Sequence, residues 1–382
     1  MRTLILDTYY PGVLKRHYAT NPELRVASYG AQLAALMELR FGTSDAYSEG
    51  LARVGVEAAE LIINCPELQA SWDREHGGRG GATRNAVARF AGSAPSWLRD
   101  EISRRYDVRT AAAQIEAFAP DVLYLQALHA LPTDELRRQR ANGRFVVGQI
   151  ASTLPDPRVV AGFDLVLTSF PHYVERVRDL GVDAEYFPIA FDERVLGGLE
   201  ENGIDAAAGT PRPHGATFVG GVNPGVHGRG TAFLEQLAER VRLSVWGYGA
   251  DSLRSASPLR AVHHGEAWGV DMYEVLGQSR IAINRHIEAA EGYSNNMRLF
   301  EASGVGALLC TEESPNLGEL FTPGREVIAY TSVDDLADKI TYYLEHDEER
   351  VEIAAAGQRR TLSEHTYARR MADLAGMLEA RL

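Results

Sequence analysis

Residues 280–310, RIAINRHIEAAEGYSNNMRLFEASGVGALLC, combine a short apolar run, a polar loop with a glycine, and a helical pattern. The run predicts a strand that ends near Asn284, and the pattern predicts a helix that begins near Asn295. Free N–H groups and the positive end of the helix dipole attract anions to such a helix start. The segment is therefore suited to hold a diphosphate.

Three polar residues stand at the predicted start of that helix: Ser294, Asn295 and Asn296. Their hydroxyl and amide groups are suited to contact a phosphate or a sugar. Ser and Asn are equally the residue types that cap helices, because their side chains accept hydrogen bonds from the first free N–H groups. Both readings stay open at the level of the sequence.

Arg298 and Glu301 are three residues apart and share one face of the predicted helix. On a protein surface such a pair stabilises a helix by only about 0.2–0.5 kcal/mol. The helix is flanked by apolar residues, so we expect it to be half-buried. A half-buried Arg and Glu need partners, and a ligand with both phosphate and hydroxyl groups offers them.

Two glycine turns follow other apolar runs in the second half. ATFVGG ends in Gly220 and Gly221, and Arg229 follows at the predicted start of a helix. Glycines let a phosphate approach the backbone, and an Arg offers it a bidentate fork. RLSVWGYG makes a similar turn, in which Tyr248 stands between two glycines. Such turns are more often structural, so they are weaker signals than residues 280–310.

Short apolar runs alternate with amphipathic stretches along the chain, which is typical of a doubly wound α/β architecture with parallel strands buried on both faces. The predicted strands are TLILD, AELIINC, DVLYLQ, RFVVGQI, DLVLTS and AEYFPI in the first half, and ATFVGG, RLSVWGYG, RIAINRH, ALLCTE and EVIAYT in the second. The predicted helices cover residues 25–53, 107–119, 171–181, 229–240, 271–279, 296–303, 333–346 and 348–380.

A chain of 382 residues is longer than one hydrophobic core usually grows, so two domains are expected. Residues 197–215 follow neither period and are rich in Gly, Pro and Ala, which indicates a linker. We predict an N-terminal domain over 1–197, a linker over 198–214, a C-terminal domain over 215–360 and a terminal helix over 361–382. A glycine-rich patch at 76–85 is expected to be a surface loop.

Composition excludes several classes of protein. The net charge of -13 disfavours nucleic acid and anionic membranes as partners. Cys65 and Cys310 lie far apart in apolar segments, so neither a disulfide framework nor a zinc site is expected. The sequence has no run of about 18 apolar residues, and its start reads as a strand and not as a signal peptide. A cytoplasmic location is therefore expected.

The segment NNMRLFEASGVGALLCTEESPNLGELFTPGREVIAYTSVDDLADKITYYLEHDEERVEIAAAGQRR resembles the C-terminal domain of GT-B glycosyltransferases, close to the spore-maturation-protein-like sugar transferases. The resemblance covers residues 215–375 well and residues 1–195 in layout. It implies two Rossmann-like domains that face a cleft, and a terminal helix over 361–382 that crosses back to the N-terminal domain. It also implies a hexosyltransferase that moves a sugar from a nucleotide-sugar donor, with UDP expected as the nucleotide, to an acceptor hydroxyl. The acceptor is a small molecule, a glycan or a carrier-bound compound.

The resemblance gives donor-binding roles to residues of the C-terminal half. Glu301 matches the Glu that binds the ribose hydroxyls in the similar enzymes. Many of them carry an earlier Glu eight positions before, where this chain has Tyr293. For the basic residue that clamps the diphosphate, Arg229 is the first candidate and Arg298 the second.

The resemblance also bears on how the nucleotide base is recognised and on whether a metal ion is needed. Gly265 and Glu266 lie in AVHHGEAWGVDMYEVLGQS, which resembles the strand, loop and helix that recognise the base. No DxD motif stands in the expected place, since Asp334 and Asp335 fall on a predicted helix start. A metal-independent enzyme is therefore expected, with the nucleotide-sugar as substrate and no cofactor.

In the N-terminal half, DTYYPG places Asp7 and Gly12 at a strand-to-helix turn, where similar enzymes bring a Gly near the donor phosphate. PDVLYLQALHALP resembles a segment that ends in a His beside the reacting sugar. Gln126 holds the aligned position here, and His129 follows three residues later. His172 follows a Pro at another predicted helix start.

Two stereochemical outcomes stay open, of which retention is expected from the similar enzymes. With retention, the leaving phosphate can take the acceptor proton. With inversion, a base must contact the acceptor, and Asp7, His129 and His172 are the candidates.

Other readings remain. A sugar-nucleotide epimerase of GT-B shape would share the donor site. A binding or morphogenetic protein that keeps the fold without catalysis is a further alternative, which the missing earlier Glu leaves open. A nicotinamide dehydrogenase fits less well, because TLILDTYYPG lacks a G-x-G-x-x-G after the first strand.

Overall fold

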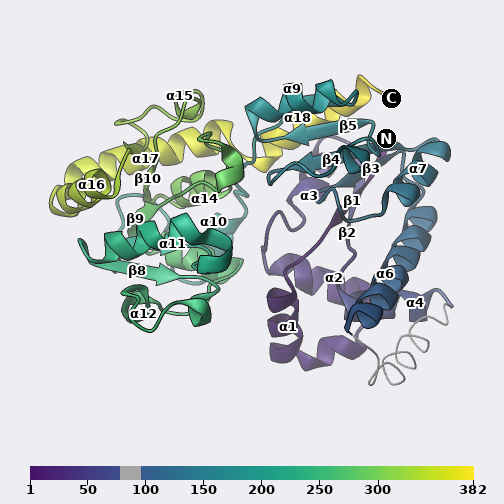
Figure 1. Cartoon of the computed structure of the whole chain (residues 1–382), viewed down its shortest axis with the longest axis horizontal. Coiled ribbons are helices and arrows are strands. Elements are labelled where there is room, and N and C mark those ends of the chain that lie inside the picture. The colour runs from purple at the N-terminus through teal and green to yellow at the C-terminus, as the bar shows by residue number, and fades with distance from the viewer. Residues whose placement is uncertain (78–95) are drawn as a thin grey trace. The chain divides into compact units, whose positions relative to one another are not determined.

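The computed structural model describes the backbone of residues 1–77 and 96–382 and the side chains of residues 1–77 and 105–382. The glycine-rich patch at 76–85 lies almost wholly outside the described residues. The chain divides into two compact units, and Figure 1 labels many of their strands and helices. Unit 1 consists of Met1–Thr168, His172–Tyr186 and Met371–Leu382, and unit 2 consists of Ser169–Pro171 and Phe187–Arg370.

Unit 1 is built on a parallel sheet of six strands in the order β2-β1-β3-β4-β5-β6. All residues of β3 and β5 are buried, as continuous apolar runs predict for strands covered on both faces. The strands are β1 (Arg2–Asp7), β2 (Glu57–Ile62), β3 (Val122–Leu125), β4 (Phe145–Ile150), β5 (Leu165–Thr168) and β6 (Asp183–Tyr186). The helices are α1 (Pro11–Thr20), α2 (Tyr29–Glu38), α3 (Ala46–Arg53), α4 (Pro66–Glu75), α6 (Ser96–Phe118), α7 (Thr133–Ala141), α8 (Pro157–Val160) and α9 (Pro171–Asp179), with a 3-10 turn η1 (Pro22–Val26).

Unit 2 is built on a parallel sheet of five strands in the order β11-β10-β9-β7-β8. Its core joins apolar strand residues such as Ile281 to Leu234 of α11 and Leu336 of α16. The strands are β7 (His214–Val219), β8 (Leu243–Trp246), β9 (Ser279–Ile283), β10 (Leu308–Glu312) and β11 (Ile328–Tyr330). The helices are α10 (Val195–Glu201), α11 (Pro224–Ala238), α12 (Leu259–Val262), α13 (Val270–Gly277), α14 (Arg298–Gly304), α15 (Leu317–Leu320), α16 (Val333–Glu345) and α17 (Asp347–Glu364), with 3-10 turns η3 (Ala250–Ser252) and η4 (Glu288–Ala290).

The predicted α/β fold with two Rossmann-like units is confirmed, and each predicted apolar run coincides with a strand. The single helix predicted over 348–380 is wrong, because α17 and α18 (Tyr367–Glu379) are separate helices. At the break, His365 Nε2 lies 2.8 Å from the Leu320 carbonyl oxygen, and Thr366 pairs with Phe191 as an isolated β-bridge. Among the described helices, none is both long and apolar enough to cross a membrane.

Residues 198–214, where the sequence indicates a linker, contain the end of α10 and a loop fixed to unit 2 by the buried side chain of Arg212. Its guanidinium donates to the backbone carbonyls of Ala206, Ala207, Leu276, Ser279 and Val305. Burial lowers the Arg212 pKa to about 10.

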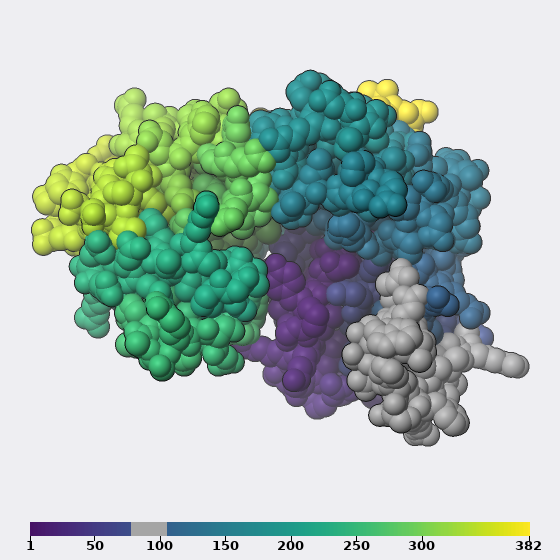
Figure 2. All heavy atoms as spheres, viewed as in Figure 1, coloured from purple at the N-terminus to yellow at the C-terminus, as the bar shows by residue number. Residues whose placement is uncertain are grey.

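The last residues of the chain, Met371–Leu382, belong to unit 1. Figure 2 shows their yellow atoms against the teal atoms of that unit. Fully buried apolar side chains of this segment are Met371, Leu374 and Leu378. Arg381 forms ion pairs with Asp183 at 2.9 Å and Glu185 at 2.7 Å, both on β6. These contacts cover the edge strand of the unit 1 sheet.

Candidate functional site

The strand order of unit 2 has a switch point between β7 and β9. From β7 the chain moves outward to β8, and then returns to form β9 on the other side of β7. In open parallel sheets, ligands bind beyond the carboxyl ends of the strands at such a point. Gly220 and Gly221 follow β7, and Asn284 follows β9, so these residues mark the candidate site.

The Gly220-Gly221 turn is tightly enclosed. A Cβ atom on Gly221 would lie 2.5 Å from His227 Nε2 and 2.7 Å from Tyr248 Cζ, so a larger residue does not fit without movement. Backbone bonds from Gly220 N–H to the Trp246 carbonyl, 2.9 Å, and from Val222 N–H to the Tyr248 carbonyl, 2.9 Å, fix the turn against the end of β8. Only glycine allows this close approach.

An aromatic cluster borders the turn. Tyr248 stacks on Trp268 with ring centroids 5.4 Å apart and planes 16° apart, and its hydroxyl lies 2.8 Å from His227 Nε2. Burial lowers the His227 pKa, which favours the neutral imidazole. Trp268 Nε1 donates to the Glu266 carboxylate at 2.8 Å. Gly265, with φ of +103°, accepts from Gly247 N–H at 2.8 Å, so the predicted base loop lies beside β8.

The polar segment after β9 differs from its prediction in one respect. Helix α14 begins at Arg298 and not near Asn295, and Met297 at its N-cap makes no side-chain cap bond. The chain turns before the helix through two left-handed residues, Glu291 with φ of +49° and Gly292 with φ of +86°. Ser294, Asn295 and Asn296 therefore precede the helix and do not cap it.

Those three side chains bind distant parts of unit 2. Ser294 Oγ lies 2.6 Å from Ser314 Oγ, and Asn295 Nδ2 donates to Ser169 Oγ at 2.7 Å. Asn296 Nδ2 donates to Asn284 Oδ1 at 2.8 Å and to the Arg285 carbonyl at 2.7 Å. Asn296 thus ties the segment to the end of β9, and Ser294 ties it to the loop after β10.

Arg298 and Glu301 form a buried ion pair on α14. Arg298 Nη1 lies 2.8 Å from Glu301 Oε2, and the two side chains are 16% and 6% exposed. Glu301 Oε1 accepts from Tyr273 OH at 3.4 Å. Burial raises the pKa of Glu301, and the charge of Arg298 opposes that rise. Because the pair is buried, the surface-pair reading of these two residues does not apply.

The predicted phosphate clamp Arg229 lies in the body of α11, five residues after the helix begins. Its side chain is 84% exposed and lies 3.4 Å from the exposed carboxylate of Glu288 in η4. Tyr293 donates its backbone N–H to the Ala290 carbonyl at 2.8 Å, so it closes the turn before Ser294.

Sequence reasoning missed Arg285 and His286, although both directly follow β9. Arg285 pairs with Glu312 at 2.9 Å and lies 4.5 Å from the centroid of the Phe233 ring. His286 is held by a bond from its backbone N–H to the Glu312 carboxylate at 2.7 Å. Burial lowers the His286 pKa to about 4, so its ring is neutral at physiological pH. Their position after a strand at the switch point was the available signal.

The predicted catalytic residues lie on separate elements of unit 1. Asp7 ends β1, its Oδ1 accepts from Thr8 N–H at 2.7 Å, and burial raises its pKa to about 6. Gly12 is the second residue of α1 and has open space where a Cβ would stand, so nothing in unit 1 requires glycine there.

His129 is exposed in the turn after β3, and His172 lies in the first turn of α9 with its ring 4.7 Å from the Tyr173 ring. Two glutamines, Gln126 and Gln149, are bound between elements at the same strand ends. Gln126 Oε1 accepts from Thr43 at 2.8 Å, and Gln149 Oε1 accepts from two buried tyrosine hydroxyls.

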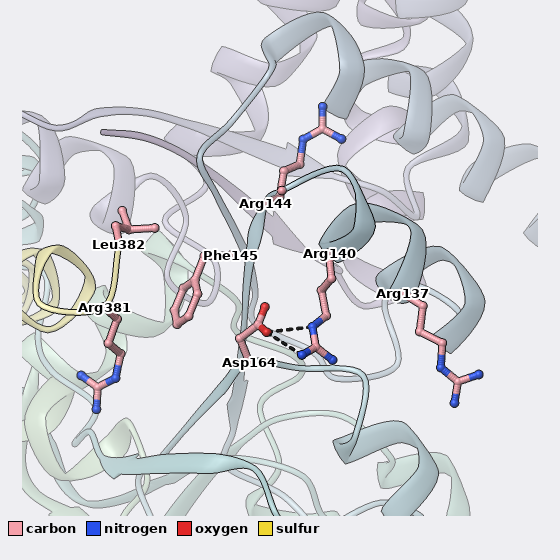
Figure 3. A pocket seen from close by; sticks show the side chains of 8 residues that line it. Arg137, Arg140, Arg144, Phe145, Asp164, Arg381 and Leu382 are labelled. Atoms are coloured by element: carbon pink, nitrogen blue, oxygen red, sulfur yellow. Dashed lines mark hydrogen bonds and ion pairs between the residues drawn. The ribbon is translucent and has the colours of Figure 1, made fainter.

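An open pocket of about 550 Å³ lies elsewhere in unit 1, at the amino ends of β4 and β5 (Figure 3). Its lining residues are Arg137, Arg140, Gly143, Arg144, Phe145, Asp164, Arg381 and Leu382. Arg140 is paired with Asp164 at 2.7 Å, and Figure 3 shows the guanidinium groups of Arg137, Arg140 and Arg144 pointing in different directions. Because ligands of such sheets bind at the carboxyl edge, this pocket is not the candidate site. Within the part of the chain that the structure describes, no three His, Cys, Asp or Glu side chains gather as a metal site.

Part of the chain matches a known protein family. Residues 229–376 match a family described as glycosyl transferase-like, and this span contains Arg229, Glu266 and Glu301. A comparison of the sequence with curated proteins finds no match.

Solved glycosyltransferase structures share the fold over the whole chain. HepE of Anabaena in complex with UDP is 13% identical with a TM-score of 0.55, and its complex with UDP-glucose is 11% identical with a TM-score of 0.57; both alignments cover 100% of each chain. Sucrose-phosphate synthase of Thermosynechococcus elongatus is 11% identical with a TM-score of 0.56, again over 100% of each chain. AviGT4, a glycosyltransferase involved in avilamycin A biosynthesis, is 14% identical with a TM-score of 0.51, over 98% of this chain and 96% of that one. The two Rossmann-like units thus have the GT-B fold of these solved structures, and residues 229–376 match the glycosyl transferase-like family.

Proposed function

We propose that the chain transfers a sugar from a UDP-sugar to an acceptor hydroxyl with release of UDP, and that unit 2 binds the UDP-sugar. The observation that carries this proposal is the switch point between β7 and β9. There, the enclosed Gly220-Gly221 turn and the polar segment from Asn284 to Glu301 follow neighbouring strands. Support for the nucleotide comes from HepE, whose solved complexes with UDP and UDP-glucose have the same fold.

Each part of the donor has a chemically suitable counterpart in this proposal. The diphosphate approaches the backbone of the glycine turn, with Arg229 or Arg298 as its cation. The Glu301 carboxylate accepts hydrogen bonds from the ribose hydroxyls. The flat pair of Tyr248 and Trp268, next to Glu266, offers aromatic and polar contacts to the base.

The proposed reaction is metal-independent and retains the anomeric configuration. The bond between the anomeric carbon and the diphosphate oxygen breaks, and the acceptor oxygen forms the new bond to that carbon. The acceptor proton passes to the leaving phosphate, whose charge the glycine-turn amides and a guanidinium stabilise. Under inversion Asp7 would be the favoured base of the three candidates, because a pKa of about 6 leaves it ionised at pH 7.

Titration calorimetry with UDP and UDP-glucose tests the donor site, using wild type and Glu301→Gln. We expect the variant to bind about 10- to 100-fold more weakly, because a charged hydrogen-bond acceptor is lost. Glu319→Gln, which changes an exposed carboxylate of α15 in the same unit, should bind like wild type. Equal affinity of wild type and Glu301→Gln would contradict the role of Glu301, and absence of UDP binding to wild type would contradict the donor.

Product analysis tests the reaction itself. NMR of the product should show the anomeric configuration of the donor, and turnover should persist in the presence of a chelator. A new sugar nucleotide formed from the donor alone would favour the epimerase reading. Donor binding with no turnover on any hydroxyl acceptor would favour a non-catalytic protein of this fold.

A further inference from the structure

Asn316 lies at the N-cap position of α15, yet its side chain makes no cap bond to that helix. Instead, its amide pairs with the backbone of Ser294, 22 positions earlier in the chain. Ser294 N–H donates to Asn316 Oδ1 at 2.8 Å, and Asn316 Nδ2 donates to the Ser294 carbonyl at 3.0 Å. Asparagine is among the residues that cap helices best. Its use on a different segment indicates that fixing Ser294 is its role.

The pairing is buried and supported by further polar contacts. Ser294 is fully buried and Asn316 is 3% exposed, so water does not compete for these bonds. Ser314 Oγ donates to Asn316 Oδ1 at 3.2 Å and lies 2.6 Å from Ser294 Oγ. His286 Nε2 lies 3.2 Å from the same Ser294 hydroxyl. The loop after β10 thus holds the segment after β9 through main-chain and side-chain bonds.

Ser294 is the point at which such a hold fixes the candidate donor segment. The two left-handed residues Glu291 and Gly292 lie just before it, and Asn296 and the start of α14 lie just after it. Without the Asn316 amide, the buried N–H and carbonyl of Ser294 lose partners that no other described residue supplies in the structure. A binding segment held in its bound geometry loses less entropy when the ligand arrives.

We propose that Asn316 is a positioning residue for the donor site: it fixes Ser294 and so preorganises the segment from Tyr293 to Glu301 for the nucleotide-sugar. This inference rests on the proposed function, because it takes that segment as the donor segment. Asn316 contacts no reacting atom in this proposal and acts through Ser294.

The test compares Asn316→Ala, Asn316→Asp and wild type in two measurements. Calorimetry with UDP should show about tenfold weaker binding for Asn316→Ala, since two buried hydrogen bonds are lost. Hydrogen exchange should be faster in residues 292–297 and unchanged in β7 and β9. Asn316→Asp keeps an acceptor for Ser294 N–H but places a carboxylate oxygen against the Ser294 carbonyl, so it should also weaken UDP binding, and it provides the measurement should Asn316→Ala fail to fold.

Asn202→Ala is the matched control, because Asn202 is an exposed asparagine of the same unit whose Nδ2 donates to Glu274 Oε1 at 2.8 Å. Asn202→Ala should leave the UDP affinity and the hydrogen-exchange rates at the wild-type level. If wild type binds UDP and both Asn316 variants bind it equally well, the positioning role is overturned while the proposed function stands. If wild type does not bind UDP, the proposed function is overturned. In that case, hydrogen-exchange rates of residues 292–297 that are the same in both Asn316 variants as in wild type would overturn the positioning role as well.

Discussion

Replacing Arg298 with Met tests the electrostatics of the candidate site. Met fills a similar volume and removes the guanidinium that lies 2.8 Å from Glu301 Oε2. At that separation, the attraction is about 6 kcal/mol for an effective dielectric constant of about 20. Desolvation offsets part of it, and removing one partner of a buried pair typically costs about 3–5 kcal/mol. Tyr273 OH, at 3.4 Å, compensates little for the lost charge.

The loss of stability caused by Arg298→Met should depend on pH. Burial raises the pKa of Glu301 even with Arg298 present, so without the guanidinium the pKa rises further. A group whose pKa is higher in the folded than in the unfolded state contributes to the free energy of unfolding below its unfolded pKa, which is about 4.3 for Glu. That contribution is lost as the pH rises through the pKa of the folded state. Arg298→Met should therefore lose about 3 kcal/mol or more near pH 8 and clearly less near pH 5.

Urea unfolding of wild type, Arg298→Met, Glu301→Gln and the double variant provides the measurement at both pH values. The double variant should recover most of the loss, because no buried charge remains without a partner. A coupling free energy below about 0.5 kcal/mol, or one that is the same near pH 5 and near pH 8, would refute the reasoning.

Two further outcomes are expected. Asp7→Asn should stabilise the protein above pH 6 and leave its stability unchanged near pH 4, because burial raises the Asp7 pKa to about 6 and the fold favours the neutral carboxyl. Melting curves recorded across this pH range measure the effect, and an equal shift of the melting temperature at every pH would contradict it. Gly221→Ala should weaken UDP binding about tenfold or more, because its Cβ would displace His227 or Tyr248. Gly228→Ala, with open space around the added Cβ, is its control in calorimetry, and equal losses in both variants would count against the enclosed turn.

The strands could be predicted because a buried parallel strand carries its signal in four to six consecutive residues. Helix α7, TDELRRQRA, gave no such signal, because only Leu136 and Gln139 of its residues are buried. The sequence predicts a strand-to-helix turn in DTYYPG, and helix α1 does follow it; Gly12 lies inside that helix because Pro11 is well tolerated in the first helical turn. The break between α17 and α18 depends on Phe191 and Leu320, which are far from it in sequence.

The site was predictable only as far as local rules reach. The rule that ligands bind after strand ends selected Gly221 and the segment around Ser294. It did not select Asn316, because its partner is 22 residues away and its N-cap position suggested a local role. The same limit explains Arg229: its position after a glycine turn indicated a clamp, whereas the kink of α11 at His227 and the exposure of the side chain appear only in the folded chain.

The return of residues 371–382 to unit 1 has a consequence for synthesis on the ribosome. Unit 2 from Phe187 to Arg370 is nearly continuous, whereas unit 1 lacks the cover of its edge strand β6 until Arg381 emerges. At about 5–20 residues per second, the stretch from Phe187 to Arg381 takes roughly 10–40 s to translate. During that time unit 2 can fold to completion while β6 presents an open edge, the kind of surface on which strands of other chains pair. Vectorial synthesis therefore makes unit 1, although it is encoded first, the last to be finished.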